Sequence, residues 1–172
     1  ASHNHLRMIM AFPSGVHPLY SAQVNRFEEQ LTSHKLNLRR DQLITLELNV
    51  GRKCNQACRH CHVDAAPWRN EILDKTTAHQ ICEWITAQTP QIVDITGGAP
   101  ELSDHFRLLV KTSRHAVCEV IDRCNLTILE EDGFEWLPDF LAAHQVTVVA
   151  SLPCYESENV IKQRGSGVFD KS

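Results

Sequence analysis

The distribution of apolar residues along the chain follows two periods. Short runs of β-forming residues predict strands over residues 43–50, 91–96, 116–121 and 146–151. Between them, apolar residues recur three and four positions apart, which predicts helices over 74–88, from 103 onward, and over 134–144. Strands that alternate with helices predict a parallel sheet with right-handed crossovers, and therefore the α/β class.

The ends of the predicted helices have recognisable start signals. Asp74 and Ser103 are expected to cap the first two helices, and Pro138 to bend or begin the third. Earlier in the chain, Val24, Phe27 and Leu31 predict an amphipathic helix with Ser21 as its cap. We therefore divide the 172 residues into an irregular leader (1–20), a helix with linker (21–42) and a core domain (43–172).

Each predicted strand is followed by an unusual stretch. These are "GRKCNQACRHCH", "GGAPE", "DRCN" and "SLPCY", in chain order. Parallel α/β sheets bind ligands at the carboxyl ends of their strands. The four stretches therefore predict one site on one edge of the sheet.

Composition and charge exclude several classes of protein. The net charge is -4 and the basic residues form no run, which argues against a nucleic-acid partner. No stretch has the roughly 20 apolar residues that span a bilayer, so we expect no membrane association and a cytoplasmic protein. Seven cysteines, an odd number, fit reduced thiols with metal or catalytic roles better than a disulfide framework.

Cys54, Cys58 and Cys61 are close enough in sequence for one loop to surround a small group. A structural zinc site would need a distant fourth ligand, because His62 lies directly beside Cys61. A redox pair would use Cys58 and Cys61 and leave Cys54 without a role. A 4Fe-4S cluster held by three thiolates would leave one iron open to a ligand. The spacing alone leaves all three interpretations open.

The C-x3-C-x2-C spacing after the first strand, with a diglycine after the second, resembles the radical SAM superfamily. The resemblance implies a partial (β/α) barrel in which Cys54, Cys58 and Cys61 hold a 4Fe-4S cluster. It implies that S-adenosylmethionine binds the fourth iron. Reductive cleavage would then give a 5'-deoxyadenosyl radical.

The longer motifs "LELNVGRKCNQACRHCHVDAAPWR", "DITGGAPEL", "DRCNLTIL", "VASLPCY" and "QRGSGVFDKS" look like the arsenosugar-biosynthesis radical SAM proteins, over about residues 21–172. This resemblance implies adenosylation of a methylated arsenical, with an electron donor such as a flavodoxin or ferredoxin. The alternatives are a radical SAM enzyme that modifies a peptide or another small molecule, and a non-catalytic iron-sulfur or zinc protein.

Several other residues follow as candidates for cofactor binding. We expect His60 to pack on the cofactor, and the backbone of Gly97 and Gly98 to approach its methionine part closely. The carbonyls of Ala99 and Pro100 are expected to contact the cofactor, and Asn125 and Ser151 to contact its ribose or methionine part. Arg164 is expected to form an ion pair with its carboxylate.

The remaining cysteines fall into two groups. Cys124 and Cys154 lie at the predicted site, and we hypothesise that their soft thiols contact the arsenical as catalytic residues. Cys82 and Cys118 lie inside a helix and a strand and are expected in the core. Next to Cys124, we expect Asp122 and Arg123 to pair with each other.

The resemblance also sets an expectation for the end of the chain. The family barrel has six strands, so four βα units would be an open piece, truncated after the fourth strand, without the family's cysteine-rich C-terminal segment. The fourth strand would then be an apolar, unpaired edge. We expect partial cofactor binding, and full turnover only with the missing half.

Overall fold

The computed structural model describes residues 18–38 and 42–172, and the chain divides into two compact units, 1–41 and 42–172. The first unit contains helix α1, Pro18–Ser33. Because proline suits the first turn of a helix, α1 begins at Pro18 and Ser21 lies inside it, so the predicted cap at Ser21 is wrong. Of the leader predicted over residues 1–20, residues 18–20 belong to α1, which corrects the prediction there, and residues 1–17 lie outside the described residues.

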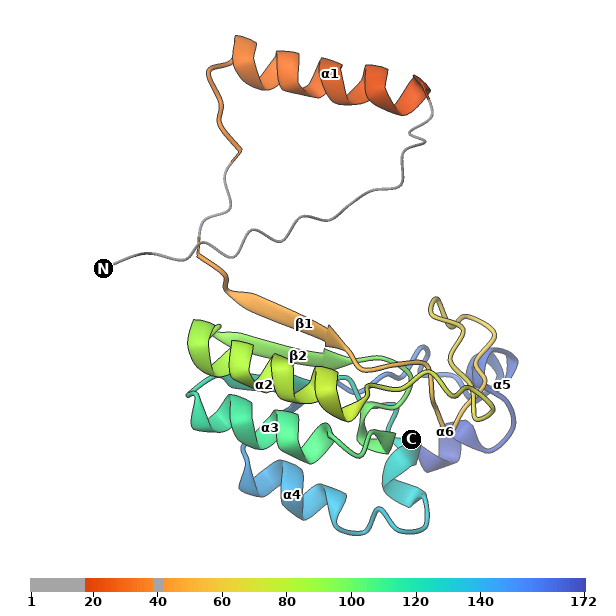
Figure 1. Cartoon of the computed structure of the whole chain (residues 1–172). Helices are drawn as coiled ribbons and strands as arrows, with labels where there is room; N and C mark the ends of the chain where they lie inside the picture. The colour runs from red at the N-terminus through yellow and green to blue at the C-terminus, as the bar shows by residue number, and fades with distance from the viewer. Residues whose placement is uncertain (1–17, 39–41) are drawn as a thin grey trace. The chain divides into compact units, whose positions relative to one another are not determined.

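The second unit is built on a four-stranded parallel sheet (Figure 1). Its strands are β1 (Thr45–Asn49), β2 (Ile92–Thr96), β3 (Glu119–Asp122) and β4 (Thr147–Val148), in the spatial order β1-β2-β3-β4. This open sheet, with helices between its strands, confirms the predicted α/β fold class. The fourth strand is shorter than predicted, because only Thr147 and Val148 pair with β3.

Helices α2 (Lys75–Gln88), α3 (Phe106–His115) and α4 (Leu137–Ala143) connect the strands and lie along one side of the sheet (Figure 1). Two 3-10 segments, η1 (Pro100–Leu102) and η2 (Thr127–Glu130), follow β2 and β3. The chain continues through α5 (Ser157–Arg164) and α6 (Val168–Lys171). In Figure 1 the gold loop after β1 and helices α5 and α6 gather at the carboxyl end of the sheet.

The predicted helix starts have different outcomes. Asp74 caps α2 as expected, because its Oδ1 accepts the Thr77 backbone N–H at 3.0 Å. The cap predicted at Ser103 is wrong, since η1 occupies that segment and α3 begins only at Phe106. The Ser103 hydroxyl instead accepts the His105 N–H at 3.3 Å, just before α3.

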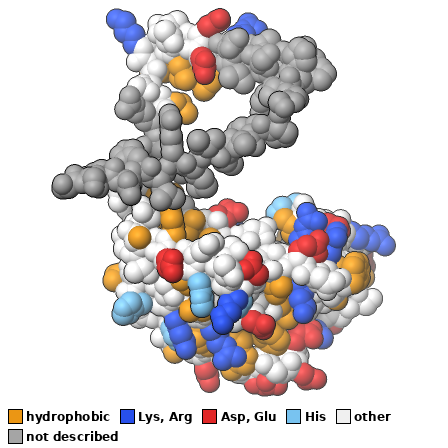
Figure 2. Space-filling model, viewed as in Figure 1, with side chains coloured by type: hydrophobic (Ala, Val, Ile, Leu, Met, Phe, Trp, Pro, Cys, Tyr) orange, Lys and Arg blue, Asp and Glu red, His pale blue; other side chains and the backbone are white. Residues whose placement is uncertain are grey.

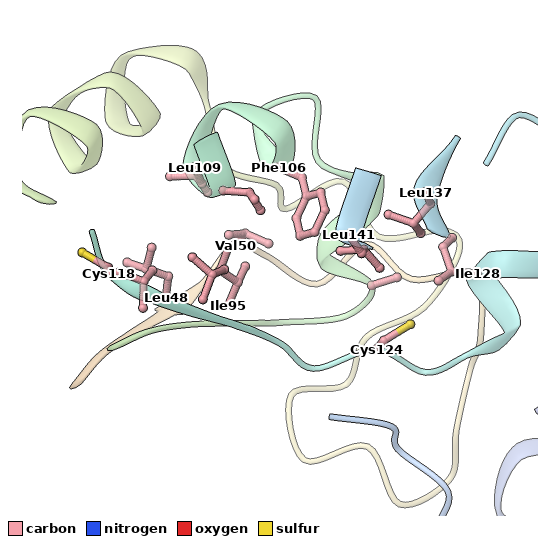
Figure 3. Close-up of a cluster of buried hydrophobic side chains, with 14 of the residues drawn as sticks. Leu48, Val50, Ile95, Phe106, Leu109, Cys118, Cys124, Ile128, Leu137 and Leu141 are labelled. Atoms are coloured by element: carbon pink, nitrogen blue, oxygen red, sulfur yellow. The ribbon is translucent and has the colours of Figure 1, made fainter. Parts of the chain in front are cut away.

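The register of the sheet determines which side chains face the helices. Leu48, Ile95 and Asp122 are aligned across β1, β2 and β3. Ile95 belongs to the buried cluster under the helices (Figure 3), together with Phe106 and Leu109 of α3. Because neighbouring strands share a pleat, Asp122 also points to this helical side.

The opposite side of the sheet carries an ion pair. Arg123 donates to both carboxylate oxygens of Asp94, from Nε at 2.9 Å and from Nη2 at 2.6 Å. The predicted pairing of Asp122 with Arg123 is therefore wrong. Successive residues of a strand point to opposite faces, so these two side chains diverge.

The surface of the described part shows mixed charge. On the face in Figure 2, acidic and basic side chains are interspersed over the helices. Across residues 18–38 and 42–172, none of the helices combines the length and apolar character needed to cross a membrane.

The end of α3 generates a stability prediction. The Val117 N–H bonds to the Arg114 carbonyl and the Cys118 N–H to the Ser113 carbonyl, which is the Schellman pattern. The residue in the left-handed position is Val117 (φ 64°), and its side chain is 88% exposed. We expect Val117→Gly to raise the free energy of unfolding by about 1 kcal/mol, because glycine avoids the steric cost at little loss of packing. Urea unfolding measures it, and a Val117→Ile control should show no gain.

Candidate functional site

A cavity of about 250 Å³ opens at the carboxyl ends of the strands. Its walls come from the cysteine loop after β1, the ends of β2 and β3, the segment after β4, and the end of α5. The lining residues are Cys54, Gln56, Cys58, His60, Cys61, His62, Ala65, Thr96, Gly97, Gly98, Arg123, Asn125, Ser151 and Arg164. The four unusual sequence stretches thus contribute to one site, as their positions after the strands predict.

The three predicted ligand cysteines share this cavity. Cys54 is buried, and Cys58 and Cys61 are half-buried. The Cys54 sulfur accepts the Gln56 backbone N–H at 3.4 Å, and the Cys61 sulfur accepts the Ala65 backbone N–H at 3.2 Å. N–H donors directed at sulfur stabilise the thiolate form that binds metal.

Burial opposes ionisation of two of these thiols. It raises the pKa of Cys54, while hydrogen bonds from Gln56 and Asn125 partly offset this effect. It also raises the pKa of Cys58, and the Arg164 guanidinium acts in the opposite direction. A bound cation must therefore displace protons from these thiols, so metal binding is coupled to proton release.

The cysteine loop is held by backbone hydrogen bonds to the diglycine segment. The Gly98 N–H donates to the Gly51 carbonyl, and the Ala99 N–H to the Lys53 carbonyl, both at 2.9 Å. A Cβ on Gly98 would lie 2.2 Å from the Lys53 carbonyl oxygen, and Gly97 adopts a φ of 141°. From the sequence we expect these glycines to admit the methionine part of a cofactor. In the structure, their missing side chains admit the cysteine loop.

Asn125 ties the segment after β3 to the same loop. Its Nδ2 donates to Asn55 Oδ1 at 2.7 Å and to Cys54 Sγ at 3.7 Å. Its Oδ1 accepts the Ile128 N–H at 3.1 Å and the Thr127 hydroxyl at 3.0 Å. The amide predicted to touch a ribose or methionine group is thus fully used inside the protein, although it also lines the cavity.

Arg164 brings a largely buried guanidinium to the cavity wall. Its side chain is buried (9% exposed), and Nη1 donates to the Asn125 carbonyl at 3.4 Å. Within the described part of the chain, its Nε has no hydrogen-bond partner. Because a buried charged donor is costly without an acceptor, this site fits an anionic ligand group.

Four predicted site residues do not line the cavity. Ala99 and Pro100 are buried beneath the cysteine loop, where the Ala99 N–H is already paired. Cys154 is half-buried and accepts from the Glu156 N–H at 3.5 Å and from Asn159 Nδ2 at 3.6 Å. Cys124 is fully buried in the core. His60, Gly97, Gly98, Asn125, Ser151 and Arg164 are brought together with the three cysteines.

Sequence reasoning missed Gln56, His62, Ala65, Thr96 and Arg123 as lining residues. The signal for Thr96 was available, because it ends the strand predicted over 91–96, directly before the diglycine. Arg123 was missed because its pairing with Asp94 joins residues on two strands.

The donor set fits a metal cluster with three protein ligands. Tetrahedral zinc would require thiolate sulfurs about 3.8 Å apart, from Zn–S bonds of about 2.3 Å. Among the described residues, one group of three potential ligand side chains has donor atoms within 4.8 Å of one another, and it does not include Cys54, Cys58 or Cys61. The sulfurs of these three cysteines are therefore not all within that distance of one another. Of the seven cysteines, the other four do not line the cavity. The arrangement fits a cluster larger than one ion, with one position left to a ligand.

Comparison with known proteins finds solved structures of similar fold. No family model matches the chain, and no curated protein matches its sequence. Its fold is similar to that of Streptococcus suis SuiB bound to S-adenosylmethionine, with a TM-score of 0.55 and 18% identity over 91% of this chain. The TM-score is 0.57 for SuiB alone (17% identity, 92% of this chain) and also for SuiB bound to precursor peptide SuiA (19%, 95%). The chain spans 34%, 35% and 36% of those three SuiB chains, in that order.

A second group of ionisable side chains lies on the helical side of the sheet. Glu101, Asp122 and Cys124, which we call the acid–thiol cluster, have donor atoms within 4.8 Å of one another. Burial raises the pKa of Glu101, and burial together with the neighbouring Glu101 carboxyl raises the pKa of Asp122 to about 9. Burial and Glu101 also raise the pKa of Cys124. Without a bound cation, the folded protein therefore holds protons here at neutral pH.

This proton uptake predicts a pH-dependent stability in the presence of a chelator. The folded state keeps a proton on Asp122 up to about pH 9, while the carboxyl in the unfolded chain loses it near its ordinary pKa of 3.8. The stabilisation is complete below about pH 4 and is lost as the pH rises toward about 9. We expect the urea midpoint to fall over this range, and to fall less steeply for Asp122→Asn. Asp104→Asn, at an exposed carboxyl, should keep the wild-type slope.

Proposed function

We propose that the chain is the core of a radical SAM enzyme, in which Cys54, Cys58 and Cys61 hold a 4Fe-4S cluster and S-adenosylmethionine binds the remaining iron. The observation that carries the proposal is the set of three thiols on the wall of one cavity that no other cysteine lines. Three thiolate ligands leave one iron open, which a purely electron-transferring cluster does not need.

The bound cofactors would supply one-electron reductive cleavage of the S-adenosylmethionine sulfonium to methionine and a 5'-deoxyadenosyl radical. The chain's own residues would orient and enclose them. The backbone amides of Gln56 and Ala65 hold two of the ligand sulfurs. The Arg164 guanidinium, on the cavity wall, would pair with the carboxylate of S-adenosylmethionine. His60, on the cavity wall, would pack against the cofactor.

The similarity to SuiB supports the same proposal. A protein of this fold binds S-adenosylmethionine, and the similarity extends over 91% of the present chain. The present chain spans about a third of the length of SuiB. We therefore propose that it acts as the core of a complete radical SAM enzyme.

Two substrate classes follow from different observations. The resemblance of the sequence motifs to the arsenosugar-biosynthesis radical SAM proteins supports a methylated arsenical as the substrate. The enzyme would transfer the 5'-deoxyadenosyl group to it in arsenosugar biosynthesis. The likeness to SuiB bound to the precursor peptide SuiA supports a peptide. Because neither Cys124 nor Cys154 lines the cavity, the cavity itself offers an arsenical no further thiol once the three cysteines bind the cluster.

The proposal extends to a reductant and a compartment. A small iron-sulfur or flavin protein, such as a ferredoxin or flavodoxin, would deliver the electron. All seven cysteines are free, which suits the reducing cytoplasm.

The cluster ligands give the first test of this proposal. After anaerobic reconstitution with iron and sulfide, wild-type protein should be brown and, once reduced, release 5'-deoxyadenosine from S-adenosylmethionine. Cys58→Ala should lose the colour, and its product should fall to the level of a protein-free sample, because three thiolates are the minimum set. Cys154→Ala is the matched control and should keep both. A colourless wild-type protein that holds zinc, or a cluster that does not cleave S-adenosylmethionine, would contradict the proposal.

Arg164 gives a second test. We expect Arg164→Gln to weaken S-adenosylmethionine binding by about 10- to 100-fold, since a hydrogen bond to a charged group contributes about 1.5–3 kcal/mol. Equilibrium dialysis of the reconstituted protein measures it. Arg59→Gln changes an exposed arginine that does not line the cavity, so it should bind like the wild type. Equal affinities of the two variants would remove Arg164 from the cofactor site.

A product assay separates the two substrate classes. The reconstituted protein is incubated with S-adenosylmethionine, a reductant and either a methylated arsenical or a candidate precursor peptide. A 5'-deoxyadenosyl arsenical seen by mass spectrometry supports the first class. A peptide whose mass changes only with S-adenosylmethionine present supports the second.

A further inference from the structure

The acid–thiol cluster stands where the fold calls for apolar side chains. Asp122 is in register with Ile95, which is in turn in register with Leu48, in a row that faces the helices. Cys124 belongs to the same buried core, at the end of the group in Figure 3 that also holds Ile128. Glu101 reaches this region from η1, which directly follows the diglycine. Two segments, η1 and the end of β3, thus converge on one buried point.

The carboxyl groups of this cluster have no hydrogen-bond partners outside it. Asp122 is fully buried and Glu101 is 3% exposed. Within the described part of the chain, no donor from outside the cluster reaches any of their four oxygen atoms. Burying a carboxylate without a donor or a cation costs several kcal/mol, so these oxygens need either shared protons or a metal ion.

The donor atoms suit one transition-metal ion. The cluster offers one sulfur and four carboxylate oxygens, and the donor atoms of the three residues lie within 4.8 Å of one another. Two carboxylates and a thiolate give the mixed hard and soft set that zinc and iron(II) accept, whereas magnesium and calcium prefer oxygen alone. A carboxylate that binds through both oxygens would complete four-coordination.

We propose that Glu101, Asp122 and Cys124 form a structural binding site for one divalent transition-metal ion, zinc by preference. The site is separate from the cavity, because none of its three residues lines that cavity. It is also independent of the proposed radical SAM function, which uses other cysteines.

The position of the site suggests what the metal does. Glu101 lies three residues after Gly98, and Cys124 lies directly before Asn125. Both Gly98 and Asn125 bond to the cysteine loop. A metal bound to η1 and to the end of β3 would therefore fix both supports of that loop relative to each other. It would act as a positioning element for the three cavity thiols, without contact with a substrate.

Cobalt(II) is the probe for this site, because a thiolate–cobalt bond gives an intense near-ultraviolet charge-transfer band. The experiment uses the full chain with Cys54, Cys58 and Cys61 replaced by alanine, so that the cavity contributes no sulfur ligand. We expect one cobalt per chain with that band, and displacement by one zinc. Adding Cys124→Ser should abolish the band. Glu101→Gln and Asp122→Asn should each weaken binding by at least about 100-fold, since even outer-shell changes cost 10- to 100-fold.

Cys118→Ser is the matched control. Cys118 is also a fully buried thiol, but it lies outside the cluster, so its replacement should leave the band unchanged. Glu101→Gln guards against misfolding, because its amide can donate to Asp122 and keep the core paired. Zinc should raise the thermal midpoint of the cavity-alanine chain and leave that of its Glu101→Gln form unchanged. The proposal is overturned if no charge-transfer band forms, if the band survives Cys124→Ser, or if Cys118→Ser removes it equally.

Discussion

The site depends on one close backbone contact, between the diglycine after β2 and the cysteine loop after β1. The Gly98 and Ala99 amides donate to the carbonyls of Gly51 and Lys53, immediately before Cys54. The contact is possible because position 98 has no Cβ, which would otherwise collide with the Lys53 carbonyl. The register of β1 and β2 thus continues beyond the strands and fixes the position of Cys54 at the carboxyl edge of the sheet. A loop without this support would have no fixed geometry for a cluster.

The order of the helical and strand elements was predictable, because it rests on local patterns. Periods of two and of 3.6 residues located β1 to β3 and helices α2 to α4, and Asp74 marked a helix start that the structure confirms. The errors occur where local and longer-range preferences compete. Ser103 looked like a helix cap, yet it instead follows the 3-10 segment η1, which begins at Pro100 and ends at Leu102. Pro18 starts α1 three residues before Ser21.

The candidate site was predictable only in part, for a different reason. The topology brings the ends of parallel strands together, so the four unusual stretches could be expected to share one edge of the sheet. Which atoms face the cavity depends on contacts between segments far apart in sequence. Asn125 looked like a cofactor ligand, but its amide is occupied by Asn55 and Cys54, about 70 residues earlier. Arg123 looked like a partner for its neighbour Asp122, although the pleat directs it to Asp94.

The end of β3 and the two residues after it show how one short segment serves two purposes. Arg123 extends from one face into the cavity, and its bidentate bond to Asp94 fixes the guanidinium while leaving Nη1 free of that pair. Asp122 and Cys124 point to the other face, into the core, where the Asp122 carboxyl has no donor from outside the cluster and the Cys124 sulfur accepts the Leu126 N–H at 3.3 Å. Alternation therefore places a half-exposed charge between a buried acid and a buried thiol within three consecutive residues. Burying an ionisable side chain this completely costs several kcal/mol of desolvation free energy, whereas an apolar side chain of similar volume would fill the same space without that cost. The proposed metal ion would account for the two buried acids and the thiol that η1 and the end of β3 bring together.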